Sequence, residues 1–221
     1  MTLHIIYQVI TEDTDKDILQ NTANNKIETA ADWFNTNKLT LNSKKTRTMN
    51  ISPNKAEIKL NLNIDNTNIS HISPTEKEQY FKFLGFRMDN RLTWKYHTKH
   101  VRNKILTVNF ILATTKTTFI KDTKKIIYTA LGQSHIEYGI TIWFNKQIEK
   151  ELNKLQKKSI RKITNSKYNS HTAELFSNTK ILKSNELYKL SKCRLIKKSQ
   201  LEQTPERIHH LFKKHQTYRP Q

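Results

Sequence analysis

The sequence is poor in cysteine and glycine and contains no long apolar run. Its only cysteine, Cys193, excludes an internal disulfide and is typical of a protein in a reducing, intracellular setting, with nuclear and cytoplasmic locations both open. Its three glycines leave no phosphate-binding loop of the usual glycine-rich kinds. No stretch approaches the roughly 18 apolar residues of a membrane span. The N-terminal residues lack the features of a signal peptide, so we expect neither a membrane partner nor secretion.

Acidic residues are also scarce, and they are distributed unevenly. The chain has 39 Lys and Arg against 19 Asp and Glu, which gives a formal net charge of +20. Residues 1–94 hold 12 basic and 11 acidic side chains, whereas residues 95–221 hold 27 and 8. A surplus confined to one half favours a basic face that attracts polyanions, and nucleic acid is the partner this predicts. A solvated lysine-rich surface without a dedicated ligand is the alternative.

The first half of the sequence alternates between helical and strand patterns. Asp13 and Asp15 suit the first turn of a helix that continues with apolar residues at spacings near four, namely Ile18, Ala23, Ile27, Ala30 and Phe34. Strands are predicted from Arg47 to Ser52, from Ile58 to Ile64 and from Tyr80 to Met88. The last of these contains Gly85, where we expect the backbone to turn.

From Trp94 onward the apolar period becomes that of helices. One helix is marked by Val101, Ile105, Val108, Ile111 and Leu112, and a second by Ile126, Ile127, Ala130, Leu131 and Ser134. Further helices are predicted over Ile148 to Ile163, Ser184 to Gln200 and Pro205 to Phe212. The fold class is therefore α+β, with a small antiparallel β region over residues 1–94 and a basic, mainly α-helical region over residues 95–221.

Several short motifs occur in an order known from one family. Residues 31–42 read ADWFNTNKLTLN and are followed by Lys45, Thr46 and Met49. This segment resembles the stretch after the catalytic aspartates in reverse transcriptases of non-LTR retrotransposons. Residues 83–86 (FLGF), with Leu92-Thr93-Trp94, Val101 and Lys104, look like the family's primer-grip turn and first thumb helix.

The later motifs are similar to the helical region that follows the polymerase core in jockey-like elements of this family. They comprise residues 134–139 (SHIEYG), Trp143, Leu155-Gln156, Ile160-Arg161, His171-Thr172, Leu175-Phe176 and Leu182. The resemblance implies that residues 1–94 are a palm remnant with a primer grip at Phe83, Leu84 and Gly85. Residues 95–221 would then be a thumb with a basic C-terminal extension.

The same residues also have a purely structural interpretation. Trp33, Phe34, Phe83, Leu84 and Trp94 are expected to be core side chains, and Gly85 is expected at a turn. The resemblance implies that Lys45 is a vestige of a lysine near the nucleotide phosphates. A surface lysine without a role is the alternative.

The residues that hold catalytic metal in this family are missing from the sequence. Polymerases use carboxylates to bind two metal ions that activate the primer hydroxyl and stabilise the leaving oxygen. Neither the first aspartate nor the aspartate pair of the family's aromatic-Ala-Asp-Asp turn is present. We therefore expect a C-terminal fragment that carries no catalytic residue, metal site or cofactor and is inactive alone. The intact parent enzyme would use Mg²⁺, and a separate upstream polymerase portion is a candidate partner.

Asp13, Asp15 and Asp17 do not replace that metal site. Their alternate spacing is that of a calcium loop, but the sixth loop position is Ile18 and the twelfth is Asn24, where such loops need Gly and Glu. An acidic first turn of a helix explains the three aspartates better.

Binding of template–primer duplex is the function that the resemblance implies for this region. The candidate contacts to phosphate are Arg102, Lys104, Lys116, Lys121, Lys124 and Lys125, and such contacts position a duplex without reading its sequence. An RNA/DNA hybrid and a DNA duplex are both open. The alternatives are a non-catalytic nucleic-acid-binding protein derived from a retroelement, or a decayed remnant without function.

Overall fold

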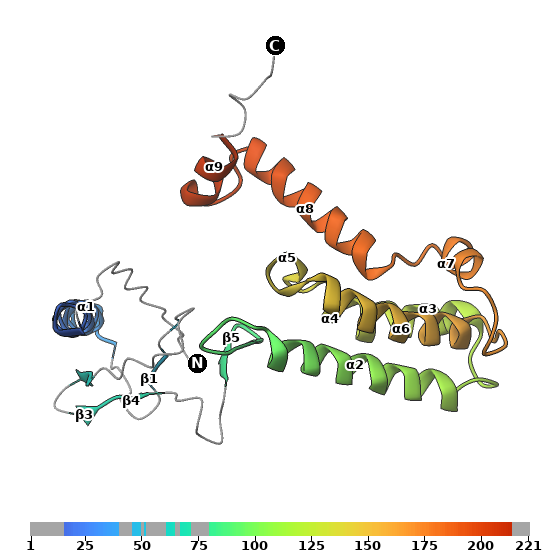
Figure 1. Cartoon of the computed structure of the whole chain (residues 1–221), viewed down its shortest axis with the longest axis horizontal. Helices are drawn as coiled ribbons and strands as arrows, with labels where there is room; N and C mark the ends of the chain where they lie inside the picture. Colours follow the sequence, from blue (N-terminus) through green and yellow to red (C-terminus); the bar gives the residue numbers. More distant parts are fainter. Residues whose placement is uncertain are drawn as a thin grey trace, which may run out of the picture. The chain divides into compact units, whose positions relative to one another are not determined.

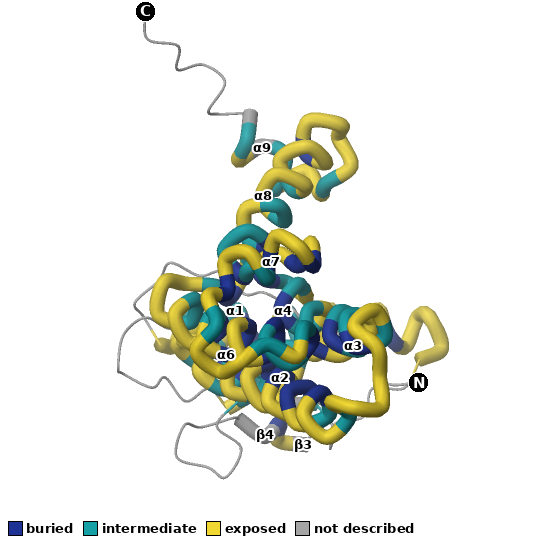
Figure 2. Tube along the Cα trace, turned by 90° about the vertical axis from the view of Figure 1, so that its right-hand side faces the viewer, coloured by how far each residue is buried: buried dark blue, intermediate teal, exposed yellow. Residues whose placement is uncertain are grey.

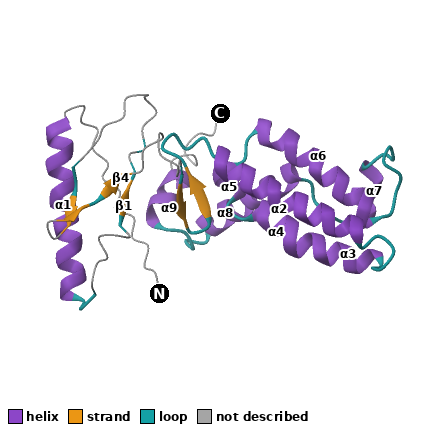
Figure 3. Ribbon diagram, turned by 90° about the horizontal axis from the view of Figure 1, so that it is seen from below, coloured by secondary structure: helices purple, strands orange, loops and turns teal. Residues whose placement is uncertain are grey.

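The computed structural model describes residues 16–39, 46–49, 51, 61–64, 67–71 and 80–213. Helices predominate and small two-stranded sheets accompany them, which makes the fold α+β at a coarse level (Figures 1 and 3). The chain divides into two compact units, Met1–His97 and Thr98–Gln221. Within the described residues, no helix is both long enough and apolar enough to cross a membrane.

The first unit contains the predicted N-terminal helix, α1 (Lys16–Thr36). Its buried residues are Ala23 and Phe34, and Ala23 joins Leu62, Ile69 and the partly buried Ile27 in a small apolar cluster. Gln20 fastens the helix to the following segment, because its side chain donates to the Asn61 carbonyl (2.6 Å) and accepts from the Asn61 amide (2.8 Å). Asp13 and Asp15 lie outside the described residues.

Short strands pair beside this helix. Strand β1 (Arg47–Thr48) pairs in parallel with β4 (Ser70–His71), and β2 (Asn63–Ile64) pairs antiparallel with β3 (Thr67–Asn68). The strands predicted over Arg47 to Ser52 and Ile58 to Ile64 are thus described only in part, since residues 52–60 lie outside the described ranges.

The predicted strand from Tyr80 to Met88 is a hairpin instead. Strands β5 (Phe81–Phe83) and β6 (Phe86–Met88) pair antiparallel across a two-residue turn at Leu84 and Gly85. Both turn residues have positive φ, 44° and 84°, as in the tight hairpin turn that matches strand twist. The turn expected at Gly85 is therefore confirmed, but it divides the predicted strand into two.

Of the five expected core residues, only Phe34 is buried, Phe83 and Trp94 are half-buried, and two are exposed. Trp33 is 53% exposed and Leu84 is 60% exposed. Trp33 comes one residue before Phe34 and therefore points about 100° away from it around α1. Phe34 takes the buried position, and the two rings meet edge to face at 5.4 Å. Leu84 is exposed because it occupies the tip of the hairpin.

A buried carboxylate leads from the hairpin into the next helix. Asp89 is 5% exposed and accepts hydrogen bonds from the backbone amides of Arg91, Thr93 and Trp94, and from the Thr93 hydroxyl. These bonds satisfy the Asp89 carboxylate with local donors and fix the backbone just before the helix that begins at Lys95.

The second unit is entirely helical in its described part (Figures 1 and 3). Its helices are α2 (Lys95–Thr114), which begins in the first unit, α3 (Lys121–Tyr128), η2 (Thr129–Gln133), α4 (Ser134–Glu137), α5 (Ile140–Trp143), α6 (Lys146–Ile163), α7 (Ala173–Thr179), α8 (Ser184–Gln200) and α9 (Glu206–Lys213). The predicted helices over residues 148–163, 184–200 and 205–212 are confirmed to within two residues at each end.

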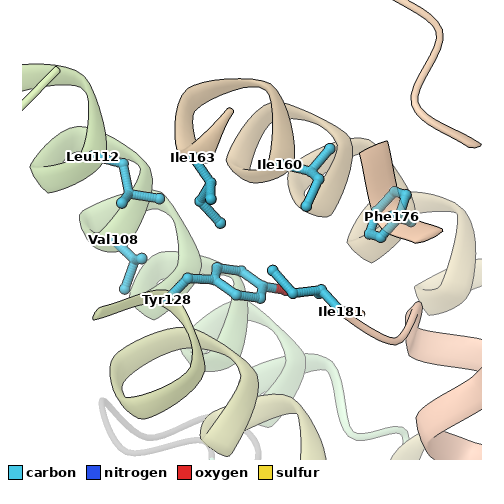
Figure 4. Close-up of a cluster of buried hydrophobic side chains, with 7 residues drawn as sticks. All are labelled: Val108, Leu112, Tyr128, Ile160, Ile163, Phe176 and Ile181. Carbon is cyan, nitrogen blue, oxygen red and sulfur yellow. The ribbon is translucent and has the colours of Figure 1, made fainter. Parts of the chain in front are cut away.

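The core of this unit lies where α2, α3, α6 and α7 meet. Buried apolar side chains from these helices and from the α7–α8 connection pack together in one cluster (Figure 4). The cluster comprises Val108, Leu112, Tyr128, Ile160, Ile163, Phe176 and Ile181. Tyr128 is the only member with a side-chain polar group, and that hydroxyl accepts a hydrogen bond from Nε2 of buried Gln156 at 3.0 Å.

The helical run Lys121–Glu137 contains a π-helical turn, η2, between α3 and α4. Its buried residues recur every four positions, at Lys124, Tyr128, Gly132 and Ile136. A spacing of four drifts by about 40° per step around a regular α-helix. The wider π turn removes part of this drift and keeps all four residues on the core side.

Burial of Tyr128 predicts a loss of stability at alkaline pH. Burial raises the pKa of Tyr128 to about 12, the Gln156 hydrogen bond lowers it in part, and Glu137 adds to the increase. The folded state therefore keeps a proton that the unfolded state loses above pH 10. The free energy of unfolding is expected to fall by about 2 kcal/mol as pH rises from 10 to 12. Denaturant titrations across this range measure the fall, and Tyr128→Phe should remove this part of it. An equal fall in the variant would contradict the assignment.

Candidate nucleic-acid interface

The two candidate cations on α2 do not share one face of the helix. Arg102 and Lys104 are both exposed, but two residues correspond to a rotation of about 200° around the helix axis. Arg102 lies on the side of exposed Lys99, Leu106 and Phe110. Lys104 lies at the other margin of the buried stripe, so the pair contributes to two different surfaces.

The charge of Lys104 acts on α4. Burial lowers the pKa of His135, and the positive charge of Lys104 lowers it further. The imidazole of His135 also faces that of His100, with ring centroids 6.2 Å apart. Lys104 therefore contributes positive charge at the margin of α2 beside α4, and such charge favours attraction of phosphate.

Three further candidates lie close together in the chain, at the connection between α2 and α3. Lys116 and Lys121 are exposed, and Lys125 is half-buried. Lys121 and Lys125 are one turn apart on α3, so their side chains lie on the same face. We call Lys116, Lys121 and Lys125 the α3 cations. Figure 2 shows α3 with both buried and exposed positions, as expected of a helix at the surface of a bundle.

Lys124 is not part of this surface, and its assignment as a phosphate contact is wrong. Its side chain is fully buried. The ammonium group donates to the Lys116 carbonyl at 2.7 Å and to Oδ1 of Asn165 at 2.8 Å. These bonds tie the start of α3 to the preceding loop and to the residues after α6. The charge of Lys124 is thus used inside the fold, where a nucleic acid has no access.

A larger group of cations lies on α6 and was not among the sequence-based candidates. Lys146, Lys150, Lys154 and Lys157 are exposed, and Arg161 is half-buried. At 100° per residue these five positions fall within one arc of about 80°, opposite the buried residues Leu152, Leu155, Ser159 and Ile163. We call this row the α6 cationic face. It extends over about 22 Å of helix.

The cations of the α6 cationic face repel one another. Within the described residues, none of its five cations forms an ion pair with a carboxylate. Lys146 and Lys150, Lys150 and Lys154, and Lys157 and Arg161 are like-charge pairs four residues apart, and each such pair destabilises a helix by about 0.2–0.5 kcal/mol. A bound polyanion would relieve this repulsion.

The neighbouring lysines show the same electrostatics. Burial lowers the pKa of Lys162, and Lys158 lowers it further. The Lys162 ammonium group donates to the Asn109 carbonyl at 2.6 Å, which joins α6 to α2.

An exposed tyrosine follows the C-terminal end of this face. Tyr168 is 83% exposed, in a turn in which the Ser170 amide donates to the Lys167 carbonyl at 3.1 Å. Arg161 holds the turn in two ways. Its Nε donates to the Ser170 carbonyl at 3.1 Å, and its guanidinium carbon lies 5.8 Å from the centroid of the Tyr168 ring.

The sequence contained a signal for the α6 cationic face. The helix over residues 148–163 was predicted, and projecting its lysines at 100° per residue would have placed them opposite its apolar stripe. Lys45 lies outside the described residues. Phe83 ends strand β5, and Leu84 and Gly85 form the β5–β6 turn.

Comparison with protein-family models, with curated proteins and with solved structures finds no match to this chain.

Proposed function

We propose that this chain is part of an RNA-directed DNA polymerase of a jockey-like non-LTR retrotransposon, and that its helical unit binds the template–primer duplex without carrying out catalysis. The family assignment rests on the order of the sequence motifs. The binding role rests on one observation, the exposure of cations on the helices of a unit that has few acidic residues.

The contacts we propose are Arg102, Lys104 and the α3 cations. All five side chains reach the surface in full or in part, whereas Lys124 does not. Because lysine and arginine at such positions contact phosphate and sugar, binding is expected to be independent of base sequence and to weaken as salt is raised. Two surfaces are involved, since Arg102 and Lys104 lie on different sides of α2.

The expected result is a flatter salt dependence when the α3 cations are neutralised. Fluorescence anisotropy with a labelled RNA/DNA primer–template duplex, titrated at several salt concentrations, gives the slope of log affinity against log salt. Each lost phosphate contact reduces that slope by about 0.9, so Lys116, Lys121 and Lys125 changed together to Gln should flatten it by nearly 3.

A matched control removes the same charge from the first unit. Lys16, Lys38 and Lys82 are exposed there, and changing these three to Gln alters the net charge equally. This control is expected to keep the slope of the unchanged protein. A slope that survives neutralisation of the α3 cations, or an equal reduction in the control, would refute their assignment as contacts. No binding by the folded protein at low salt would refute the proposed function itself.

A further inference from the structure

The α6 cationic face ends at Arg161, which also contacts the Tyr168 ring. The face extends from Lys146 to Arg161 along the exposed side of one helix. Arg161 is its last member, and it is also the residue that holds the Tyr168 turn through the Ser170 carbonyl and the tyrosine ring. The row of positive charge thus leads to an exposed aromatic ring that lies beside the last cation of the row.

This combination fits a single strand better than a duplex. Along a duplex the faces of the bases are stacked inside the helix and are not accessible to a protein ring at its surface. In a single strand each base has a free face, and proteins bind such strands with a row of cations for the backbone and aromatic rings for the bases. An exposed tyrosine at the end of a lysine row supplies both elements.

We propose that the α6 cationic face and Tyr168 form a binding site for single-stranded nucleic acid, with backbone phosphates along α6 and one base stacked on the Tyr168 ring. Stacking has no preference for one base, because every base has an aromatic face. The Arg161 guanidinium lies beside the ring in the free protein, and this contact reduces the ordering that binding requires.

This site goes beyond the proposed duplex binding and does not depend on it. It uses a different helix from Arg102, Lys104 and the α3 cations, and a different form of nucleic acid. A polymerase that holds a duplex also has to hold the unpaired strand that leads to it, so both sites are compatible within one protein.

The test measures anisotropy of a labelled oligothymidylate, which cannot pair with itself, with the full chain. Tyr168→Ala is expected to weaken binding about 5- to 150-fold, the range for losing one stacked base, while Tyr168→Phe keeps the affinity. Changing Lys150, Lys154 and Lys157 together to Gln is expected to flatten the log–log salt slope by about 2, at 0.7 per phosphate on a single strand.

The matched control changes Lys189, Lys197 and Lys198 of α8 to Gln, which removes equal charge from exposed positions on another helix. Its salt slope is expected to stay unchanged. Oligothymidylate affinity that is the same for Tyr168→Ala and Tyr168→Phe overturns the proposal, and so does an equally flattened slope in the α8 control.

The primer–template duplex, measured with the same variants, separates this site from the proposed function. Tyr168→Ala is expected to leave duplex affinity unchanged. If the unchanged protein binds no duplex but binds oligothymidylate through Tyr168, the proposed function fails and this site stands. If it binds duplex but Tyr168→Ala has no effect on oligothymidylate, this site fails and the proposed function stands. Circular dichroism melting confirms that each variant is folded.

Discussion

Changing Lys124 to glutamate is expected to lower the free energy of unfolding by about 3–5 kcal/mol, the usual cost of an uncompensated buried charge. The Lys124 ammonium group donates to the Lys116 carbonyl and to Asn165 Oδ1. A carboxylate at this position would bring a negative charge against the oxygen atoms that now accept those bonds, in a position closed to water. Denaturant titration followed by circular dichroism measures the loss.

Lys121→Glu is the matched control, because it makes the same charge reversal at an exposed position on the same helix. Its stability is expected to stay within about 0.5 kcal/mol of the unchanged protein. The comparison separates a structural lysine from a binding lysine. A Lys124→Glu variant that is as stable as Lys121→Glu and has lost duplex binding would contradict the structural role of Lys124 and make it a contact.

Changing Gln156 to leucine is the second substitution with a large expected effect. The Gln156 side chain donates to the Tyr128 hydroxyl (3.0 Å) and to the Leu182 carbonyl (3.2 Å), and accepts from the Ser184 amide (2.8 Å). Leucine fills a similar volume but leaves these groups without their partner. At about 1–3 kcal/mol for each buried group, the expected loss is on the order of 3–5 kcal/mol.

This loss should appear as a decrease in Tm on the order of 10 °C for a chain of this size. Gln147→Leu provides the control, because Gln147 is exposed on the same helix, α6, and its replacement is expected to change Tm little. A Gln156→Leu variant that melts like Gln147→Leu would show that the three hydrogen bonds contribute no net stability.

Helix positions were predictable from the sequence because they depend on local patterns. The ends of α6 and α8 agree with the predicted ranges to within two residues, because the spacing of apolar residues along the sequence indicates where each helix begins and ends. Hairpin β5–β6 was less predictable. Its turn requires positive φ at Leu84 as well as at Gly85. Leucine rarely adopts positive φ, so its presence in the sequence did not predict this turn.

The apolar residues that mark the helical run Lys121–Glu137 in the sequence are not all buried. Ile126 and Leu131 are 66% and 49% exposed, whereas Lys124 and Tyr128 are buried. Hydrophobicity alone favours burial of Ile126 and Leu131. The protein buries the lysine and the tyrosine because Asn165 and Gln156, distant in sequence, satisfy their polar atoms. Local patterns contain no information about such distant partners.

The same reason accounts for the outcome at the candidate interface. Lys124 was predicted to contact phosphate from its residue type alone. Its burial and its hydrogen bonds to Lys116 and Asn165 show that it does not reach the surface. Conversely, the α6 cationic face could have been predicted from the sequence, because it follows from a helix whose range was predicted. The proximity of this face to Tyr168 could not have been predicted, since it depends on the hydrogen bond from Arg161 to the Ser170 carbonyl across a loop.

The π turn at Thr129–Gln133 gives this segment an unusual tolerance to changes in chain length. A turn with bonds from residue i to i+5 holds one residue more than an α turn. Deleting one residue there would place Tyr128 and Ile136 seven positions apart, which brings them within about 20° of each other on a regular α-helix. Relatives that are one residue shorter at this point would therefore keep the same core with an uninterrupted helix. Alignments of this segment should permit a single-residue gap.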